Sequence, residues 1–598
     1  MFATFFDASD SFSFTLTAKF ALLKLKIYQI ILLRYVFAIL LYLPLISSAQ
    51  IKKKYPQHYF RWPLSLRPEI VANMGELRSN HWHMGLDIRT AQKVNQRVYA
   101  AADGYISYVG IRPFSYGRFI KITHPNGFTT LYGHLNDFNP ALEKYVTEQQ
   151  YKQESWAIEL DIPKGKFPVK KGDFIAFSGT TGGSQGPHVH FEIRDTKTDE
   201  CLNPLLFGMP LADNVKPSMV KLAMYDRNVS VYEQTPKFFP LRNTASGYIV
   251  YNTPVIKTAS SKVSFSLQAF DRITGSNNRD GIYAAKIFFD NKPQVEFVID
   301  SIDYNATVYV NSQVDYKYNA NGGDYMQHLS KMPGDNGGVY HLINGDGIIE
   351  LKDDAIHSIK IEIHDAYGNS SRLNFKLQHD ENAVKAIPKT SPQVFVPGYV
   401  NVFEKPDFEA YLPEDCVYDT IIPVYLRSNS SITNAVSALH QLNDETLPIH
   451  GNMSVRIKPD KIIPEGWMDK LVIKRTYKNS STVKKAQWQG NWLSADFGDF
   501  GTFQVFADTE PPLVNDIGKG DTINLSASSR IVITPTDDFG IKNFRAELDG
   551  QWIRFTNDKG RSWIYIFDEH CPRGIHQLSV TVEDIAGNVT KKDWVFKR

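Results

Sequence analysis

Short segments that mix apolar and polar side chains in strand-like patterns recur along most of this 598-residue chain. Residues 118–123 and 128–132 are two such segments, and the dipeptide Asn126-Gly127 between them favours a tight hairpin between antiparallel strands. Residues 470–477 and 502–506 have the same character. The pattern therefore predicts a mainly β protein.

One segment departs from this pattern. Residues 141–152 contain good helix formers and neither glycine nor proline. They lie between two strand regions, so we expect a single helix inserted into a sheet domain.

An internal repeat occurs in the part of the chain after residue 212. The segment from His357 to Asn369 matches the segment from His576 to Asn588, with His, Asp, Gly and Asn in register. Three apolar residues alternate in each copy and place one face of a strand in a core, namely Ile359, Ile361 and Ile363 in the first and Leu578, Val580 and Val582 in the second. The Asp-x-x-Gly-Asn sequence that follows is typical of a turn into a final strand.

These hairpins resemble the closing hairpins of immunoglobulin-like bacterial surface modules. Each repeat ends a segment that opens with Asp-x-x-x-Pro, at Asp213 and at Asp508, and this opening predicts a linker. We therefore expect immunoglobulin-like β-sandwiches at 213–380 and 509–598. Residues 381–508 are expected to form a third β-sandwich of uncertain type, and residues 50–212 a separate first domain.

Composition and charge limit the classes of function that the chain could have. Hydrophobic residues make up 42% and charged residues 22% of the chain, as in folded globular proteins. A formal net charge of +2 provides no electrostatic basis for binding nucleic acid. Three cysteines, far apart in sequence, supply neither a disulfide framework nor a Cys-rich zinc site. A catalytic metal would therefore need histidine and carboxylate ligands.

The first 49 residues have the features of an export signal. Lys24, Lys26 and Arg34 precede an apolar run over residues 35–46, and Ser-Ser-Ala at 47–49 offers a cleavage site. We expect cleavage after residue 49 and a mature protein in the periplasm or cell envelope. The alternative is an uncleaved membrane anchor over residues 27–46, which Arg34 would interrupt.

Candidate chemistry is concentrated in three short stretches of the first part. They are His83-Met-Gly-Leu-Asp87, Tyr132-Gly-His134 and Gly186-Pro-His188-Val-His190-Phe-Glu192. His188 and His190 are two apart, so in a strand both side chains point to the same face. His83 and Asp87 are four apart, which gives one face in a strand or a helix, and Gly85 between them makes a helix less favourable.

Two imidazoles and one carboxylate around zinc leave a fourth position for water, as in catalytic zinc sites. Such an ion lowers the pKa of its bound water from about 15.7 toward 7 and polarises a carbonyl group. Two histidines would remain unbound, and free imidazoles can transfer protons near neutral pH.

Together the three stretches resemble the signature of the lysostaphin-type zinc metallopeptidases, also called the LytM or M23 family. The resemblance covers residues 74–204 and includes further matching text at 75–78, 98–104, 169–173 and 178–184. It implies a small antiparallel β-sheet core with zinc in a groove and endopeptidase activity on peptidoglycan peptides. It also implies that the zinc ligands are His83, Asp87 and His190, and that His134 and His188 are catalytic histidines that do not bind the metal.

Two features depart from the family pattern. Residues 136–168 form a longer link than usual, so the predicted helix is expected to cap or narrow one end of the groove. Gln185 stands where the family commonly has threonine. His81 lacks the glycine and aspartate spacing of His83 and is interpreted as a supporting residue, and His124 is interpreted as structural.

The leading functional hypothesis is a working cell-wall endopeptidase, because all five metal and catalytic positions are present. Two alternatives remain open from the sequence: a non-catalytic wall-binding or amidase-activating module, and a zinc protease acting on exported proteins. The β-sandwiches would serve as scaffold or as contacts for an envelope protein partner.

Overall fold

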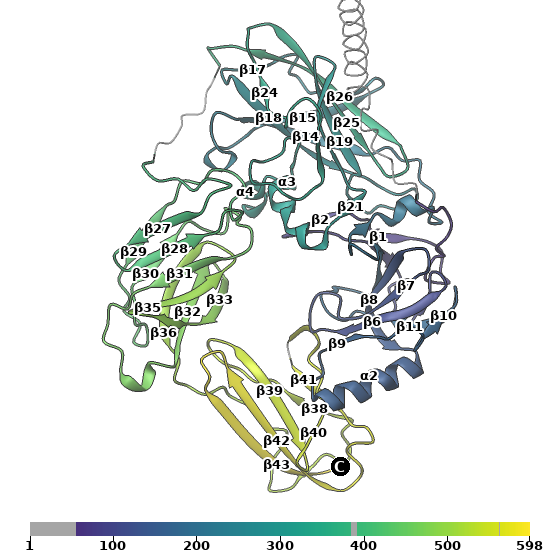
Figure 1. The fold of residues 1–598 in the computed structure, drawn as a ribbon, viewed down its shortest axis with the longest axis vertical. Helices are drawn as coiled ribbons and strands as arrows, with labels where there is room; N and C mark the ends of the chain where they lie inside the picture. The colour runs from purple at the N-terminus through teal and green to yellow at the C-terminus, as the bar shows by residue number, and fades with distance from the viewer. Residues whose placement is uncertain (1–54, 384–390, 561) are drawn as a thin grey trace, which may run out of the picture. The chain divides into compact units, whose positions relative to one another are not determined.

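The computed structural model describes residues 55–383, 391–560 and 562–598 (Figure 1). It is mainly β, with 44% of residues in strands and 8% in helices, so the predicted fold class is confirmed. The predicted export signal lies outside the described residues. Within the described ranges, no helix has both the length and the apolar character needed to cross a membrane.

The first sheet is built from antiparallel pairs in the order β1-β4-β12-β8-β7-β6-β10, with further strands paired at its sides. Its strands are β1 (Ile70–Ala72), β4 (Leu86–Arg89), β5 (Arg97–Tyr99), β6 (Gly104–Ile111), β7 (Arg118–Thr123), β8 (Phe128–Phe138), β9 (Ile158–Asp161), β10 (Pro168–Val169), β11 (Phe174–Ser178), β12 (His188–Asp195), β13 (Cys201–Leu202) and β21 (Ser301–Ile302). A separate small hairpin pairs β2 (Leu77–Arg78) with β3 (His81–Trp82).

The predicted hairpin and helix are both confirmed in this region. β7 and β8 pair across the turn at Gly127, whose φ of 86° suits glycine. The helix α2 (Pro140–Gln153) exceeds the predicted segment by one residue at each end. It begins at a proline, which the first helical turn tolerates, and the Asn139 side chain accepts a hydrogen bond from the backbone N–H of Leu142 at 3.1 Å.

A second sheet follows, in the order β22-β18-β14-β15-β16-β26-β25-β19-β20-β23. Its strands are β14 (Ser218–Asp226), β15 (Lys237–Thr244), β16 (Gly247–Val250), β17 (Ile256–Thr258), β18 (Lys262–Phe270), β19 (Ala284–Phe289), β20 (Lys292–Val298), β22 (Gln327–His328), β23 (Tyr340–Leu342), β24 (Ile349–Glu350), β25 (Ile356–His364) and β26 (Ser370–His379). Short helices α3 (Val310–Gln313) and α4 (Tyr316–Ala320) interrupt it. β21 of this stretch pairs with β13, so the first sheet continues past the predicted boundary near residue 212.

Residues 401–507 form two antiparallel sheets, β27-β28-β31-β35-β34 and β29-β30-β36-β32-β33, that share one apolar core. The strands are β27 (Asn401–Lys405), β28 (Phe408–Leu412), β29 (Tyr425–Ser428), β30 (Leu439–Leu442), β31 (Met453–Ile457), β32 (Leu471–Tyr477), β33 (Ser480–Lys485), β34 (Gln487–Gln489), β35 (Trp492–Phe497) and β36 (Gly501–Ala507).

The last part has the sheet β37-β43-β42-β39-β40 and the pair β38-β41 around a further core. These strands are β37 (Ile523–Asn524), β38 (Arg530–Ile533), β39 (Ile541–Leu548), β40 (Gln551–Trp552), β41 (Trp563–Ile566), β42 (Ile575–Asp584) and β43 (Val589–Lys597). The proposed domain boundaries near residues 212, 380 and 508 stay predictions.

The two halves of the sequence repeat fold into equivalent hairpins, β25–β26 and β42–β43. Their alternating apolar residues are buried, as the pattern predicted. In the first turn the backbone N–H of Asn369 donates to Asp365 Oδ1 at 2.8 Å, and in the second that of Asn588 donates to Asp584 Oδ1 at 2.8 Å. The repeat is therefore one structural element used twice.

The burial of β25 predicts the effect of two isoleucine substitutions on stability. Ile361 is fully buried and Ile356 is 54% exposed on the same strand. We expect Ile361→Ala to lower the free energy of unfolding by about 2–5 kcal/mol through lost burial and a cavity. Ile356→Ala is the matched control and should change it by less than about 0.5 kcal/mol. Urea unfolding followed by fluorescence measures both, and equal effects would contradict the assigned burial.

Candidate metal centre

Three neighbouring strands of the first sheet bring the predicted site residues together. β12 lies between β4 and β8, and its residue His190 is opposite Asp87 on β4 and opposite Gly133 on β8. His134 follows Gly133 directly, and His188 precedes His190 by two positions on β12. Strand register thus places four of the five predicted residues at one point of the sheet.

His83 reaches the same point by a different route from the one that the sequence predicted. β4 begins only at Leu86, so His83 lies outside the strand and shared strand parity with Asp87 is not the reason for their contact. The backbone of His83 bonds to residues of the preceding loop, with its N–H donating to Glu76 O at 2.9 Å. A Cβ on Gly85 would lie 2.3 Å from Phe191 O, so only glycine lets this segment pass so close to β12.

Three potential ligand atoms converge. His83 Nε2 lies 2.9 Å from Asp87 Oδ1, His190 Nδ1 lies 3.0 Å from the same oxygen, and the two nitrogens are 3.0 Å apart. These residues are only 1–4% exposed. A tight, buried cluster of this kind is able to hold a single metal ion.

Outer hydrogen bonds fix which ring nitrogens face the cluster. His83 Nδ1 lies 2.7 Å from the Asn73 carbonyl oxygen, which accepts only, so Nδ1 carries the proton and Nε2 presents a lone pair. His190 Nε2 lies 2.8 Å from the Glu192 carboxylate, so the same argument leaves a lone pair on Nδ1. When His190 is neutral, the cluster contains two ring nitrogens with lone pairs and a carboxylate oxygen, which a cation satisfies.

The pKa of His83 agrees with a neutral ring, whereas the raised pKa of His190 means that a metal ion must displace a proton from this ring. Burial lowers the pKa of His83 to about 4, although Asp87 acts against it, so this imidazole is neutral. For His190, burial acts to lower the pKa, but hydrogen bonds to Asp87 and Glu192 outweigh it and raise the pKa to about 9. The carboxylates around His190 therefore stabilise positive charge at this point, whether a proton or a metal supplies it.

A buried hydrogen-bond network outside the cluster holds His190. The role of this network was not predicted from the sequence. Glu192 Oε1 accepts from Tyr116 Oη at 2.7 Å, and Glu192 Oε2 accepts from Arg194 Nε at 2.6 Å. On the other side, Arg78 donates to Asp87 Oδ2 at 2.6 Å. Glu192 could have been found, because it continues the alternation of His188 and His190 along one strand face, whereas nothing in the sequence marks Tyr116.

His134 and His188 lie beside the cluster, with ring centroids 4.7 Å apart. His134 Nδ1 donates to the Thr181 carbonyl at 2.8 Å, which leaves a lone pair on Nε2, and burial lowers its pKa to about 3. His188 Nδ1 lies 2.9 Å from the Gly186 carbonyl, and its Nε2 lies 3.3 Å from Asp87 Oδ1. Both rings are thus oriented by backbone carbonyls.

The remaining sequence candidates lie outside this cluster. His81 is exposed and its ring contacts the Ser79 carbonyl at 2.9 Å. His124 is buried and bonds to Asp103 O and Thr130 Oγ1, each at 2.8 Å, as expected of a structural histidine. Gln185 is exposed, and nothing in the structure explains its difference from threonine. The three cysteines are free and buried.

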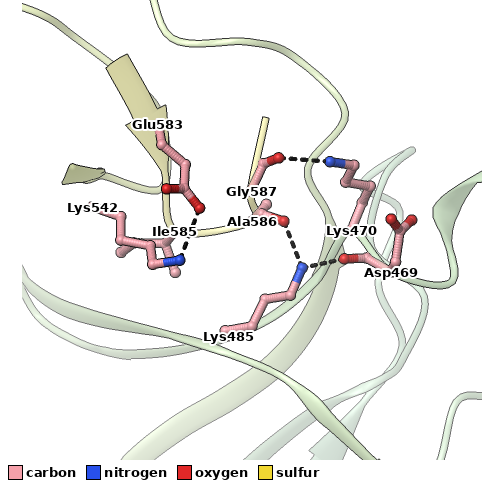
Figure 2. A pocket seen from close by; sticks show the side chains of 8 residues that line it. All are labelled: Asp469, Lys470, Lys485, Lys542, Glu583, Ile585, Ala586 and Gly587. Carbon is pink, nitrogen blue, oxygen red and sulfur yellow. Dashed lines mark hydrogen bonds and ion pairs between the residues drawn. The ribbon is translucent and has the colours of Figure 1, made fainter. Parts of the chain in front are cut away.

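A pocket elsewhere in the chain shares no residue with the cluster. Figure 2 shows its lining, where Lys470 Nζ donates to Gly587 O at 2.8 Å and Lys542 Nζ lies 2.8 Å from Glu583 Oε1. Its lining residues include no histidine, so it lacks the groups that the hydrolytic hypothesis needs.

Comparison with known proteins identifies two parts of the chain. Residues 81–151 match Peptidase family M23, and residues 392–508 match the Zu5-like domain. The chain therefore contains a peptidase M23 domain, as the sequence resemblance indicated, followed by β-rich domains.

Curated relatives match less than a quarter of this chain. The cell division protein DipM of Caulobacter vibrioides is 29% identical over 139 residues, which cover 23% of this chain and 18% of DipM. The DD-carboxypeptidase/endopeptidase Mpg of Neisseria meningitidis is 34% identical over 128 residues, which cover 21% of this chain and 23% of Mpg. The chain thus spans less than a quarter of the length of these relatives.

Among solved structures, a zinc-containing peptidase from Vibrio cholerae is 26% identical. The match covers 23% of this chain and 37% of that one, with a TM-score of 0.17.

The network around Glu192 predicts a loss of metal affinity. Glu192→Gln removes the negative charge that orients His190, and we expect the affinity for zinc to fall about 10–100-fold. Competition with a chromophoric chelator measures this affinity. Glu159→Gln is the matched control, because Glu159 is exposed and pairs with Arg112, which directly follows β6. Equal zinc affinity of the Glu192 variant and the control would contradict the assigned role.

Proposed function

We propose that the peptidase M23 domain of this chain is a zinc-dependent endopeptidase that hydrolyses peptide cross-links of bacterial peptidoglycan. The observation that carries this proposal is the cluster of His83, Asp87 and His190, in which two ring nitrogens and a carboxylate oxygen lie within 3.0 Å of one another. Two nitrogen ligands and one oxygen ligand are the donor set of a catalytic zinc site with an open position.

In this proposal each residue has a defined task. His83 presents a neutral ring nitrogen, His190 presents one after metal has displaced its Nδ1 proton, and Asp87 contributes a charged oxygen that Arg78 orients. A zinc ion held by these residues would supply a water of lowered pKa and would polarise the carbonyl of the scissile bond. The buried side chains around the cluster limit the access of bulk water and so strengthen its electrostatic interactions.

His134 and His188 are proposed as the proton-transfer groups. The lone pair on His134 Nε2 is available because Nδ1 is bound to Thr181. Burial keeps the ring neutral and makes it a weak base, so it would accept a proton only from a water whose pKa bound zinc has lowered, and would then donate that proton readily. His188 lies beside the metal-binding atoms and is suited to stabilise the oxyanion that develops on the substrate.

The substrate class is proposed from the relatives. Mpg carries the name DD-carboxypeptidase/endopeptidase and is 34% identical to this chain over 128 residues. Export of this chain, through the predicted signal at residues 1–49, would place it where peptidoglycan peptides occur. The β-rich domains after residue 212 are proposed to position the enzyme on the wall or on an envelope protein partner.

The direct test is mass spectrometry of muropeptides after incubation of purified cell wall with the zinc-loaded chain. We expect cross-linked dimers to be converted to monomers. His134→Ala should lower the rate about 10²–10⁴-fold without loss of zinc, because it removes a proton-transfer group and no ligand. His190→Ala should lose both zinc and activity.

His81→Ala is the matched control for these histidine variants, since His81 is exposed and lies two residues from His83. It should retain full activity. A zinc-loaded chain that never changes the muropeptide profile would reject the endopeptidase proposal in favour of a non-catalytic amidase-activating or binding module. If the chain cleaves exported proteins instead, its substrate is a protein and not peptidoglycan.

A further inference from the structure

Two clusters of three aspartates lie outside the peptidase domain, and neither takes part in the chemistry above. The first triad is Asp213, Asp271 and Asp365, and the second triad is Asp508, Asp537 and Asp584. In each triad the three residues offer carboxylate oxygens within 4.8 Å of one another.

The two triads occupy equivalent places in the repeated element. Each combines the aspartate of an Asp-x-x-x-Pro linker, an aspartate after an earlier strand of the module, and the aspartate of the Asp-x-x-Gly-Asn turn. In the first module, Asn369 Nδ2 donates to Asp365 Oδ2 at 2.7 Å and approaches the Asp213 carbonyl at 3.5 Å.

In the second module, Asn588 Nδ2 makes the corresponding contacts, at 2.8 Å to Asp584 Oδ2 and 2.9 Å to the Asp508 carbonyl. The hydroxyl two residues after each asparagine also donates to a linker proline carbonyl at 2.6 Å, from Ser371 in the first module and Thr590 in the second. The same polar arrangement is therefore built twice from different surrounding sequence.

Buried oxygens in both triads lack hydrogen-bond donors. Asp271 and Asp508 are each 3% exposed, yet Asp271 Oδ1 and Asp508 Oδ2 have no hydrogen-bond partner. Asp213 Oδ2 is likewise unpartnered, whereas its Oδ1 accepts from the backbone of Val215 and Thr274. A carboxylate oxygen removed from water without a donor is costly unless a cation binds it.

The triads lack direct basic partners in the part of the chain that the structure describes. None of the six aspartates forms an ion pair there with lysine, arginine or histidine. Near the second triad, Lys470 and Lys485 donate to the carbonyls of Gly587 and Ala586 in the turn, at 2.8 and 2.5 Å, rather than to carboxylates (Figure 2).

The uncompensated charge also affects protonation. Burial, with help from Asp365 and Asp213, raises the pKa of Asp271 to about 7. Burial and the neighbouring Asp537 and Asp584 raise the pKa of Asp508 to about 6. Near neutral pH these carboxyls are therefore able to ionise once a cation is present.

We propose that each triad binds one calcium ion. All candidate ligands are oxygens, which hard cations prefer. The triads therefore differ from zinc sites, whose ligands include histidine or cysteine. Calcium accepts six to eight oxygens in irregular geometry, so three aspartates with backbone carbonyls and water suit it better than magnesium, which requires near-ideal octahedral geometry.

The position of the triads gives the ions a structural task. One ligand of each comes from a linker, at Asp213 or Asp508, and the other two come from the module that follows. A bound ion ties the linker to the module and thereby restricts the bending of the chain at that junction. Calcium would then stiffen the β-rich part of the protein without touching the histidine cluster.

The test is calcium titration by calorimetry of the zinc-loaded full chain, after dialysis into calcium-free buffer. Zinc loading keeps calcium out of the histidine cluster. The triads predict two calcium ions per chain, a rise in the melting temperature with calcium, and a much smaller response to equal magnesium. Asp271→Asn and Asp537→Asn should each remove one ion, and the double variant both.

Both aspartate variants should fold without calcium. Replacing a carboxylate that its neighbours repel with a neutral amide should leave the calcium-free protein at least as stable as the unchanged protein. Asp324→Asn is the matched control, since Asp324 is exposed and belongs to neither triad. The Asp324→Asn variant should bind both calcium ions. Absence of calcium binding, unchanged stoichiometry in the triad variants, or an equal response to magnesium would overturn the proposal.

Discussion

Three potential metal ligands face one small volume inside the first sheet, and hydrogen bonds from the surrounding structure hold them there. Two are ring nitrogens of His83 and His190, and the third is a carboxylate oxygen of Asp87. Because the outer nitrogens of both rings donate to acceptors that cannot exchange roles, neither ring is able to turn its proton inward without losing a buried hydrogen bond. This constraint prepares the site for a cation before any cation binds.

Supporting groups extend that constraint well beyond the ligands. Glu192, which fixes His190, is itself held by Tyr116 and by the buried Arg194, so its negative charge is compensated in the interior. Asn73, which fixes His83 through its carbonyl, uses its side-chain amide to bond to both backbone groups of Gly281. The position of His83 thus depends partly on Gly281, which lies more than 200 residues after Asn73 in the chain.

The sequence predicted the elements that depend on local chemistry. The Asn-Gly turn, the helix after Asn139 and the two repeated hairpins follow from turn residues, helix formers and alternation, and the structure has them. The five site residues were found from spacing and family resemblance, and the structure brings them together, although their roles stay proposed. Long-range features were not predictable, because nothing local signals them. The contact of β13 with β21, the path of His83 outside a strand, and Tyr116 beneath His190 all depend on packing between distant segments.

The position of bound zinc is the most direct test of the proposed site, and a crystal structure with anomalous scattering at the zinc edge measures it. We expect one strong zinc peak bonded to His83 Nε2, His190 Nδ1 and an Asp87 oxygen at about 2.0–2.2 Å, with an open position toward His134 and His188. A peak at the aspartate triads or the cysteines instead, or zinc in the cluster with four protein ligands and no open position, would contradict it.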